Sequence, residues 1–169
     1  MWLRFEKEKC TGCGACVVAC MDEYGRPVRG RFCRLYEREF FDDGRLRVDF
    51  YITGCQHCED APCIQACPQR CFSRDRETGF VLLDAFACQR CGRCVQACRF
   101  GVVTQGQGEK AAKCNGCAER VRRGTLPRCV EVCRVGAIRP EHADGNAHEV
   151  YLKNLHRELS AFMEKERKR

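Results

Sequence analysis

The apolar and polar positions divide the chain into stretches with different periods. Residues 31–41 and 46–53 are rich in aromatic and branched side chains, and Asp42-Asp43-Gly44-Arg45 between them is typical of a turn. This pattern predicts a β-hairpin. Shorter apolar runs predict strands at 3–6 and 80–84, and the Gly- and Gln-rich residues 105–110 predict a loop.

The C-terminal stretch has a helical period. Over residues 148–168, charged side chains separate apolar ones that recur at helical spacing, namely Val150, Leu152, Leu155, Leu159, Phe162 and Met163. This spacing predicts an amphipathic helix. Two interpretations of that helix are open, which are packing on its own domain and docking on a partner subunit.

The composition changes this picture, because 18 of the 169 residues are cysteine. That fraction exceeds the roughly 8–10% that marks a cysteine-built scaffold, and it leaves little Leu, Ile and Val for a large apolar core. The first residues have no apolar secretory region, and no apolar run reaches the ~20 residues of a membrane span. We therefore expect a cytoplasmic protein, without membrane insertion, whose cysteines bind metal rather than form disulfides.

The cysteines fall into four groups of four, with Cys33 and Cys71 left over. The first and third groups share the spacing C-x2-C-x2-C-x3-C and the longer pattern C-x-x-C-G-x-C-V-x-A-C, which indicates an internal duplication. In sequence order the groups are Cys10, Cys13, Cys16 and Cys20; Cys55, Cys58, Cys63 and Cys67; Cys88, Cys91, Cys94 and Cys98; and Cys114, Cys117, Cys129 and Cys133.

This spacing favours iron–sulfur clusters. Three closely spaced cysteines can wrap one face of a 4Fe–4S cube, and the fourth begins a short helix that leads to a second cube. Glycines such as Gly12, Gly14 and Gly92 permit the positive φ angles that turn backbone N–H groups toward the sulfurs. Zinc, the main alternative for CxxC pairs, has no use for the third cysteine of the first and third groups. A disulfide scaffold is disfavoured by the absence of a secretory signal.

The basic balance is weak evidence for a nucleic-acid partner. The formal net charge is +7 with every cysteine counted as neutral. Four oxidised clusters with thiolate ligands contribute about −8, which brings the loaded protein to about −1. We therefore expect no nucleic-acid partner.

At this point the residues resemble a known family. The run GCQHCEDAPCIQACPQ, the third cysteine group, and KCNGCAERVRRGTLPRCVEVC followed by Gly-Ala-Ile resemble the four-cluster ferredoxin-like subunits of the dimethyl sulfoxide reductase beta-subunit type. Relatives in that family serve formate dehydrogenases, formate hydrogenlyase, carbon monoxide dehydrogenase, tungsten aldehyde oxidoreductases and class II benzoyl-CoA reductase. The resemblance covers about residues 3–140.

The resemblance implies an α+β fold with two bacterial-ferredoxin-like lobes. Groups one and four would form one lobe, from residues 1–22 and 105–145, and groups two and three the other, from residues 55–104. A β-hairpin insertion would occupy residues 23–54, and a C-terminal helical tail residues 146–169. The family's crossed ligation implies four clusters, held by Cys10, Cys13, Cys16 and Cys133; by Cys114, Cys117, Cys129 and Cys20; by Cys55, Cys58, Cys63 and Cys98; and by Cys88, Cys91, Cys94 and Cys67.

Some residues depart from the family pattern or lie outside it. Proline follows the fourth cysteine only at Pro68, whereas Arg99 and Arg134 follow it in groups three and four. We hypothesise that these two cations raise the potentials of nearby clusters, and the alternative is two solvated arginines. We expect Cys33 and Cys71 to be buried small apolar residues, with an extra ligand or redox sensor as the alternative. We expect His57 to support the site or lie at the surface rather than bind iron.

The sequence contains no nucleophile elbow, phosphate-binding loop or nucleotide-binding fingerprint. We therefore predict a non-catalytic electron-transfer subunit that relays single electrons between a catalytic oxidoreductase and a second redox subunit or carrier. A tungsten or molybdenum pterin enzyme of the aldehyde oxidoreductase or benzoyl-CoA reductase type is the favoured partner. The alternatives are a nickel enzyme (carbon monoxide dehydrogenase or hydrogenase), a free-standing polyferredoxin, an iron–sulfur sensor and a zinc-bound interaction module.

Overall fold

The chain folds into short helices and two-stranded sheets, joined by long loops. The computed structural model describes residues 1–25, 31–142 and 147–167. In sequence order its elements are β1 (Trp2–Phe5), the 3-10 helix η1 (Lys7–Lys9), α1 (Ala15–Tyr24), β2 (Arg34–Asp42), β3 (Arg45–Thr53), α2 (Pro62–Gln65), β4 (Phe72–Arg74), β5 (Val81–Leu83), α3 (Arg93–Ala97), α4 (Ala118–Arg122), α5 (Arg128–Glu131), β6 (Ile138–Glu141) and α6 (Ala147–Arg167).

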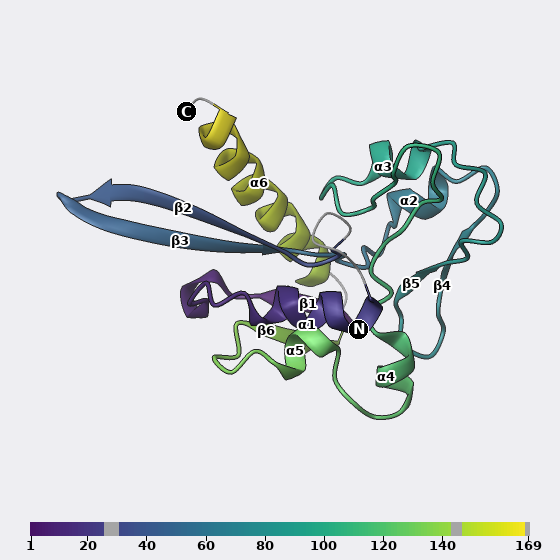
Figure 1. The fold of residues 1–169 in the computed structure, drawn as a ribbon, viewed down its shortest axis with the longest axis horizontal. Coiled ribbons are helices and arrows are strands. Elements are labelled where there is room, and N and C mark those ends of the chain that lie inside the picture. Colours follow the sequence, from purple (N-terminus) through teal and green to yellow (C-terminus); the bar gives the residue numbers. More distant parts are fainter. Residues whose placement is uncertain (26–30, 143–146, 168–169) are drawn as a thin grey trace.

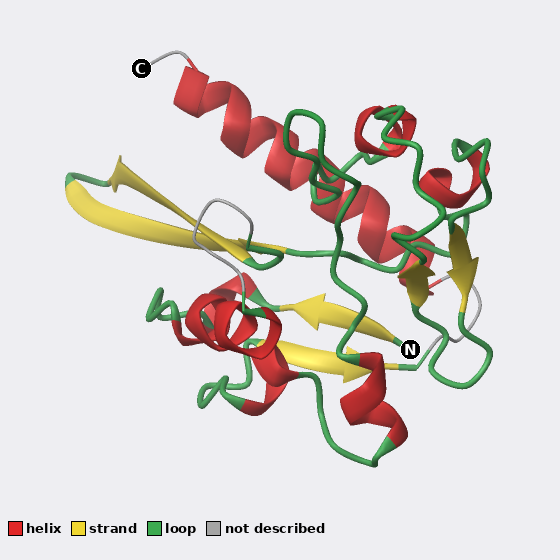
Figure 2. Cartoon of the chain, turned by 45° about the vertical axis from the view of Figure 1, so that its right-hand side comes forward, coloured by secondary structure: helices red, strands yellow, loops and turns green. Residues whose placement is uncertain are grey.

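Two of the small sheets flank the cysteine groups. One pairs the segments before group one and after group four, and the other lies between groups two and three. Strand β1 pairs antiparallel with β6, with Phe5 opposite Ile138, so the N-terminus lies beside a strand that follows the fourth cysteine group. Strands β4 and β5 form a second small sheet (Figure 2). The predicted strands at 3–6 and 80–84 overlap β1 and β5, whereas their partners β6 and β4 were not predicted.

The hairpin is the longest sheet element and projects from the rest of the molecule (Figure 1). Strands β2 and β3 pair over nine residues each, from Arg34 opposite Thr53 to Asp42 opposite Arg45. Asp43 and Gly44 join them, with φ of 48° and 73°. Asp-Gly with two positive φ angles is the preferred type I′ connection, because its twist matches that of the strands.

Helix α6 crosses the base of the hairpin and covers it. Its buried side chains Leu155, Leu159 and Phe162 pack with Tyr51 of β3 in an apolar cluster. The Phe162 ring lies 4.8 Å from the Tyr51 ring, between centroids. At the N-terminal end of α6, the His148 ring stacks on Trp2 at 4.4 Å. The end of the predicted helix at residue 168 and the predicted domain boundary at 145/146 lie outside the described residues, as do residues 26–30 of the predicted insertion.

The other two apolar clusters each contain cysteine. One joins Cys16, Cys20 and Cys33 with Phe32, Ile52, Val130 and Ile138, and helices α1 and α5 pack together there. The second joins Cys71 and Cys94 with Ala61, Phe72, Val81, Val103 and Ala111, beside the packed helices α2 and α3. The segments that carry groups one and four therefore lie together, and so do those that carry groups two and three.

Candidate metal centre

The duplicated cysteine motifs fold in the same way. Helix α1 begins after Gly14 and α3 begins after Gly92, and both glycines are left-handed, with φ of 71° and 74°. A residue with a side chain is strained in that conformation, so glycine is favoured where the loop turns into the helix. In each motif the third cysteine, Cys16 or Cys94, is buried in the first helical turn.

The first set of cysteines combines groups one and four. Burial raises the pKa of the Cys10 thiol, and the nearby charges of Cys16, Cys13 and Cys133 raise it further. Cys10, Cys16 and Cys133 also belong to one apolar cluster. The Ala137 N–H donates a hydrogen bond to the Cys133 sulfur at 3.2 Å. Three cysteines of the first motif thus lie beside the last cysteine of the fourth group.

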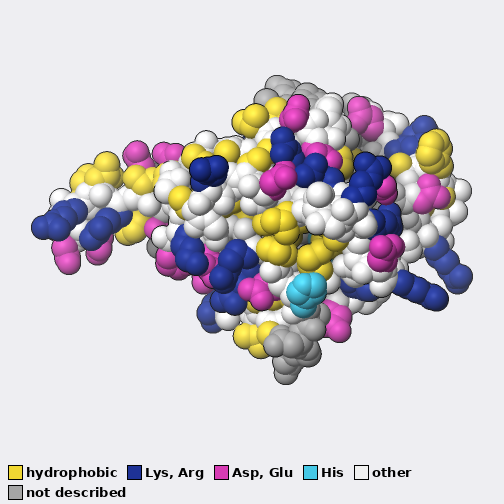
Figure 3. Space-filling view, turned by 90° about the horizontal axis from the view of Figure 1, so that it is seen from below, with side chains coloured by type: hydrophobic (Ala, Val, Ile, Leu, Met, Phe, Trp, Pro, Cys, Tyr) yellow, Lys and Arg dark blue, Asp and Glu magenta, His cyan; other side chains and the backbone are white. Residues whose placement is uncertain are grey.

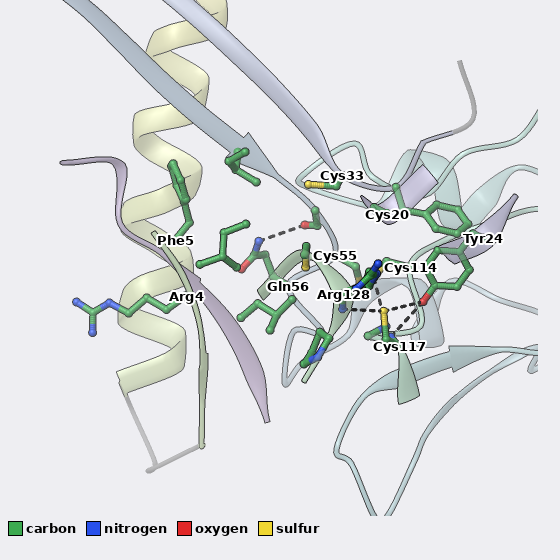
Figure 4. A pocket seen from close by; sticks show the side chains of 18 residues that line it. Arg4, Phe5, Cys20, Tyr24, Cys33, Cys55, Gln56, Cys114, Cys117 and Arg128 are labelled. Carbon is green, nitrogen blue, oxygen red and sulfur yellow. Dashed lines mark hydrogen bonds between the residues drawn. The ribbon is translucent and has the colours of Figure 1, made fainter. Parts of the chain in front are cut away.

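The second set surrounds a cavity between α1 and α5. Cys20, Cys114, Cys117 and Cys129 line it together with Cys33 and Cys55, and Figure 4 shows all of these except Cys129 with a label. Burial raises the pKa of Cys129 well above its usual range, and the charges of Cys114, Cys117 and Cys20 act in the same direction. A thiol in such surroundings keeps its proton until a strongly positive centre such as iron binds the sulfur and the proton is released.

Two further cavities hold the remaining cysteines. Cys55, Cys58, Cys63 and Cys98 line one cavity, so that three cysteines of group two meet the last cysteine of group three. The other cavity is lined in the reverse combination by Cys67, Cys88, Cys91 and Cys94. Burial raises the pKa of Cys58 to about 12 and that of Cys63 to about 11, with the Cys55 charge contributing to both.

Backbone N–H groups point at several of these sulfurs. The Gly116 N–H donates to Cys114 at 3.2 Å, that of Arg128 to Cys117 at 3.5 Å, and that of Ala111 to Cys88 at 3.5 Å. Such donors stabilise the negative charge of thiolates and of the cluster they bind.

The donor sets therefore fit a 4Fe–4S cluster in each of the three cavities. All 18 cysteines are free thiols. Among the described residues, no three His, Cys, Asp or Glu side chains lie close enough together to hold a single metal ion. In at least three of the sets, the four sulfurs line a space instead of meeting at one point.

The two leftover cysteines are buried beside these sets. A hydrogen bond with Cys16 raises the pKa of Cys33 well above its usual range, and burial adds to the effect. Burial and a hydrogen bond to the Cys67 sulfur raise the pKa of Cys71 to about 11. Cys33 and Cys71 are 6% and 4% exposed, as expected for buried small residues.

Three other side chains near the sets differ in their surroundings. His57 is buried, and its Nδ1 accepts a hydrogen bond from the Val81 N–H at 3.0 Å. Arg99 and Arg134 are both exposed, and Arg99 forms an ion pair with Asp60.

Sequence reasoning missed Lys113, which lines the cavity of Cys55, Cys58, Cys63 and Cys98. No pattern singles it out, because a lysine is normally a surface residue.

Comparison with known proteins agrees with this geometry. Residues 46–142, more than half of the chain, match the 4Fe–4S dicluster domain, and residues 3–20 match the 4Fe–4S binding domain. The protein belongs to the 4Fe–4S dicluster family. The predicted 4Fe–4S cofactor and the resemblance to ferredoxin-like electron-transfer subunits are thereby confirmed.

Several relatives of this dicluster-family protein are named as subunits of reductases, and one of them as an electron-transfer subunit. It is 33% identical over 145 residues to the B subunit of the anaerobic dimethyl sulfoxide reductase of Escherichia coli K12, and the match covers 79% of this chain and 69% of that protein. It is 37% identical over 140 residues to a thiosulfate reductase electron transfer subunit of Salmonella typhi, covering 79% and 71%. A ferredoxin-like protein of Escherichia coli O157:H7 is 36% identical over 141 residues, and that match spans 82% of this chain and only 60% of the relative. No helix in the described part of the chain is long and apolar enough to cross a membrane.

Proposed function

We propose that the chain is a non-catalytic electron-transfer subunit that holds four 4Fe–4S clusters in two ferredoxin-like lobes. The clusters supply reversible one-electron transfer when bound. We assign the ligands in crossed sets, which are Cys10, Cys13, Cys16 and Cys133 (set one); Cys114, Cys117, Cys129 and Cys20 (set two); Cys55, Cys58, Cys63 and Cys98 (set three); and Cys88, Cys91, Cys94 and Cys67 (set four).

The observation that best supports this assignment is the lining of the cavities. Cys98 lies in one cavity with Cys55, Cys58 and Cys63, although more than thirty residues separate it from them in the sequence. Cys67 lies in the next cavity with group three. Zinc knuckles or four independent loops would not need this exchange of the fourth cysteine.

The same exchange sets the order of the four sets along the molecule. Helix α1 carries Cys16 of set one and Cys20 of set two, which are one turn of helix, or about 6 Å along its axis, apart, so these two sets are neighbours. The Cys55 charge raises the pKa of Cys114, which connects set three with set two. Cys13 and Cys91, in the two outermost sets, are exposed. The order one, two, three, four thus gives a path with an exposed ligand at each end.

The protein's own residues hold, bury and insulate this path. Inner set two lies in mostly apolar surroundings, where Tyr24, Ile52 and Ile138 line the same cavity as Cys114 and Cys129. Exclusion of water limits the solvent rearrangement that accompanies each electron transfer. The backbone N–H donors keep the sulfurs oriented and favour the more negative, reduced form.

The partner we propose is a catalytic reductase that contains a molybdenum or tungsten pterin, with a second redox subunit or carrier at the other end. Support for the reductase comes from relatives whose names place them in dimethyl sulfoxide, thiosulfate and tetrathionate reductases. The pterin metal follows from the family resemblance. The aldehyde oxidoreductase and benzoyl-CoA reductase types stay a prediction, and so does the division into residues 1–22 plus 105–145, 23–54, 55–104 and 146–169.

The test is anaerobic affinity purification of the tagged chain from its native host, followed by elemental analysis. We expect about sixteen irons per chain and a co-purifying catalytic subunit with stoichiometric molybdenum or tungsten. Nickel in place of these metals would assign the chain to a nickel enzyme. Iron without any co-purifying subunit would contradict the subunit proposal and indicate a free-standing polyferredoxin.

A further inference from the structure

Lys113 is a buried lysine without a carboxylate partner. It is 6% exposed, and no ion pair joins it to a carboxylate in the part of the chain that the structure describes. Its Nζ donates hydrogen bonds to the carbonyl oxygens of Val81 and Cys114, the latter at 2.6 Å. A buried cation is costly unless an opposite charge compensates for it, and carbonyl oxygens carry no net charge.

The negative charges around Lys113 are cysteine sulfurs from two different sets. The side chain lines the cavity of Cys55, Cys58, Cys63 and Cys98. Burial and the Cys55 charge raise the pKa values of both Cys63 and Cys114, and the charge of Lys113 opposes the rise in each. Since Cys63 belongs to set three and Cys114 to set two, the ammonium group lies between the two inner sets.

The surroundings of Lys113 also prevent it from turning toward solvent. The acceptor Val81 is 1% exposed, and the N–H of the same residue donates to the buried His57. Val81 therefore binds Lys113 through its carbonyl oxygen and His57 through its N–H. A matched residue is available in Lys110, which is only partly buried and donates from Nζ to the Phe86 carbonyl at 3.2 Å.

We propose that Lys113 is the shared counter-charge of the two inner clusters and raises both of their reduction potentials relative to those of the outer clusters. This inference rests on the ligand sets of the proposed function. A fixed cation stabilises the reduced, more negative form of a nearby cluster, and low-dielectric surroundings strengthen the effect. Raised inner potentials make the step from either outer cluster toward the middle of the path more favourable than it would be without the cation.

The experiment compares Lys113→Met, Lys113→Gln and the control Lys110→Met in the full-length protein, using anaerobic redox titration monitored by EPR. In both Lys113 variants we expect two of the four midpoint potentials to fall. The expected fall corresponds to at least a tenfold change in the ratio of oxidised to reduced cluster, or about 59 mV for one electron. The outer two midpoints should move less, and Lys110→Met should move none. Unchanged midpoints in Lys113 variants that retain all their iron would overturn the proposal.

Loss of iron in both neutral variants is also decisive, because Lys113→Arg then separates charge from packing. Full iron content in Lys113→Arg would support a need for positive charge at this position. Loss of iron in Lys113→Arg as well would show that shape matters, and would overturn the electrostatic role. The wild-type protein tests the underlying function separately, because fewer than four clusters there would contradict the ligand sets whatever the Lys113 variants do.

Discussion

At the scale of single residues, burial does not distinguish a proposed iron ligand from a cysteine that binds no iron. Cys20 and Cys33 are 7% and 6% exposed, pack in the same apolar cluster and line the same cavity. Only the spacing in the sequence separates them, because Cys20 completes C-x2-C-x2-C-x3-C and Cys33 belongs to no group. Their roles in iron binding can therefore be tested with two variants of equal size.

We expect Cys20→Ala to lose one cluster, about four of sixteen irons per chain, since one iron of that cube loses its thiolate. Cys33→Ala should retain all the iron, because it removes only a thiol that hydrogen-bonds to Cys16. Anaerobic determination of iron and sulfide per chain measures both. Equal iron loss in the two variants would show that Cys33 is a ligand and that the spacing argument is wrong.

The two arginines that follow cysteine groups differ in their contacts with the sulfurs. Asp60, the ion-pair partner of Arg99, and Arg99 itself act in opposite directions on the pKa of Cys58, which burial raises to about 12. Arg99 and Arg134 are both exposed, so solvent screens both charges, but Arg99 is paired with Asp60 and acts on the pKa of Cys58. The hypothesis that both cations tune cluster potentials is therefore better supported for Arg99.

We expect Arg99→Gln to lower the midpoint potential of one cluster and Asp60→Asn to raise it. Arg99→Gln leaves the Asp60 carboxylate without its cation, whereas Asp60→Asn leaves the guanidinium without its anion. Arg134→Gln should change the midpoints less than either of these variants, since Arg134 is exposed and forms no ion pair among the described residues. Redox titration of the three variants decides the point. A shift of the same sign from Arg99→Gln and Asp60→Asn would rule out an electrostatic cause.

At the scale of elements, local patterns were sufficient for some parts of the fold. The hairpin turn depends on Asp43 and Gly44, and the pattern of α6 is visible within its own residues. Of its six apolar positions, the structure buries Leu152, Leu155, Leu159 and Phe162 and leaves Val150 and Met163 exposed. A helical period indicates which side is apolar, but the width of the covering partner decides which edge positions are buried.

Elements whose stability depends on distant partners were not predictable in the same way. Strands β4 and β6 have three and four residues, and β6 contains Pro140. Each exists because a segment elsewhere in the chain pairs with it, and β6 pairs with the N-terminal β1. Lys113 was missed for the same reason, since its environment is formed by Val81 and the second cysteine group. The crossed ligand sets came from family resemblance, because spacing alone identifies groups and not their exchange.

The packing of α6 on the hairpin gives a prediction at this scale. Phe162 is 1% exposed and contacts the rings of Tyr51 and Tyr36. Phe162→Ala should cost about 3–5 kcal/mol and lower the apparent melting temperature by roughly 6 °C or more. Met163→Ala, at a half-exposed neighbouring position, should change it by at most about 2 °C. Circular dichroism under anaerobic conditions measures both, and equal melting temperatures would mean that α6 does not stabilise the hairpin base.

At the scale of the whole molecule, the apolar core and the metal centre are the same structure. Among the described residues, two of the three apolar clusters contain proposed ligand cysteines, and the cluster of α6 and Tyr51 contains no cysteine. The surface has a mixed character, and on the face in Figure 3 basic and acidic side chains alternate around apolar areas. The hairpin differs from the rest of the molecule, because its outer half extends beyond all three apolar clusters (Figures 1 and 3).

The outer half of the hairpin carries apolar side chains that nothing in the described part of the protein covers. Phe41 and Leu46 are opposite each other in the register and are 76% and 55% exposed. A two-stranded hairpin is marginally stable in water by itself, and paired exposed apolar residues favour a covering surface. We propose that the catalytic subunit supplies that surface; the nine-residue strand is about 30 Å long.

We expect the double variant Phe41→Ser with Leu46→Ser to reduce the co-purifying catalytic subunit roughly tenfold, the equivalent of about 1.4 kcal/mol of binding free energy. Its iron content should stay at about sixteen per chain, because no cysteine group lies in the outer half of the hairpin. Val150→Ser, which replaces an exposed apolar residue of α6, is the control and should leave the yield of the complex unchanged. Full recovery of the catalytic subunit with the double variant would place the interface elsewhere, and equal loss with Val150→Ser would indicate a general effect of surface polarity on assembly.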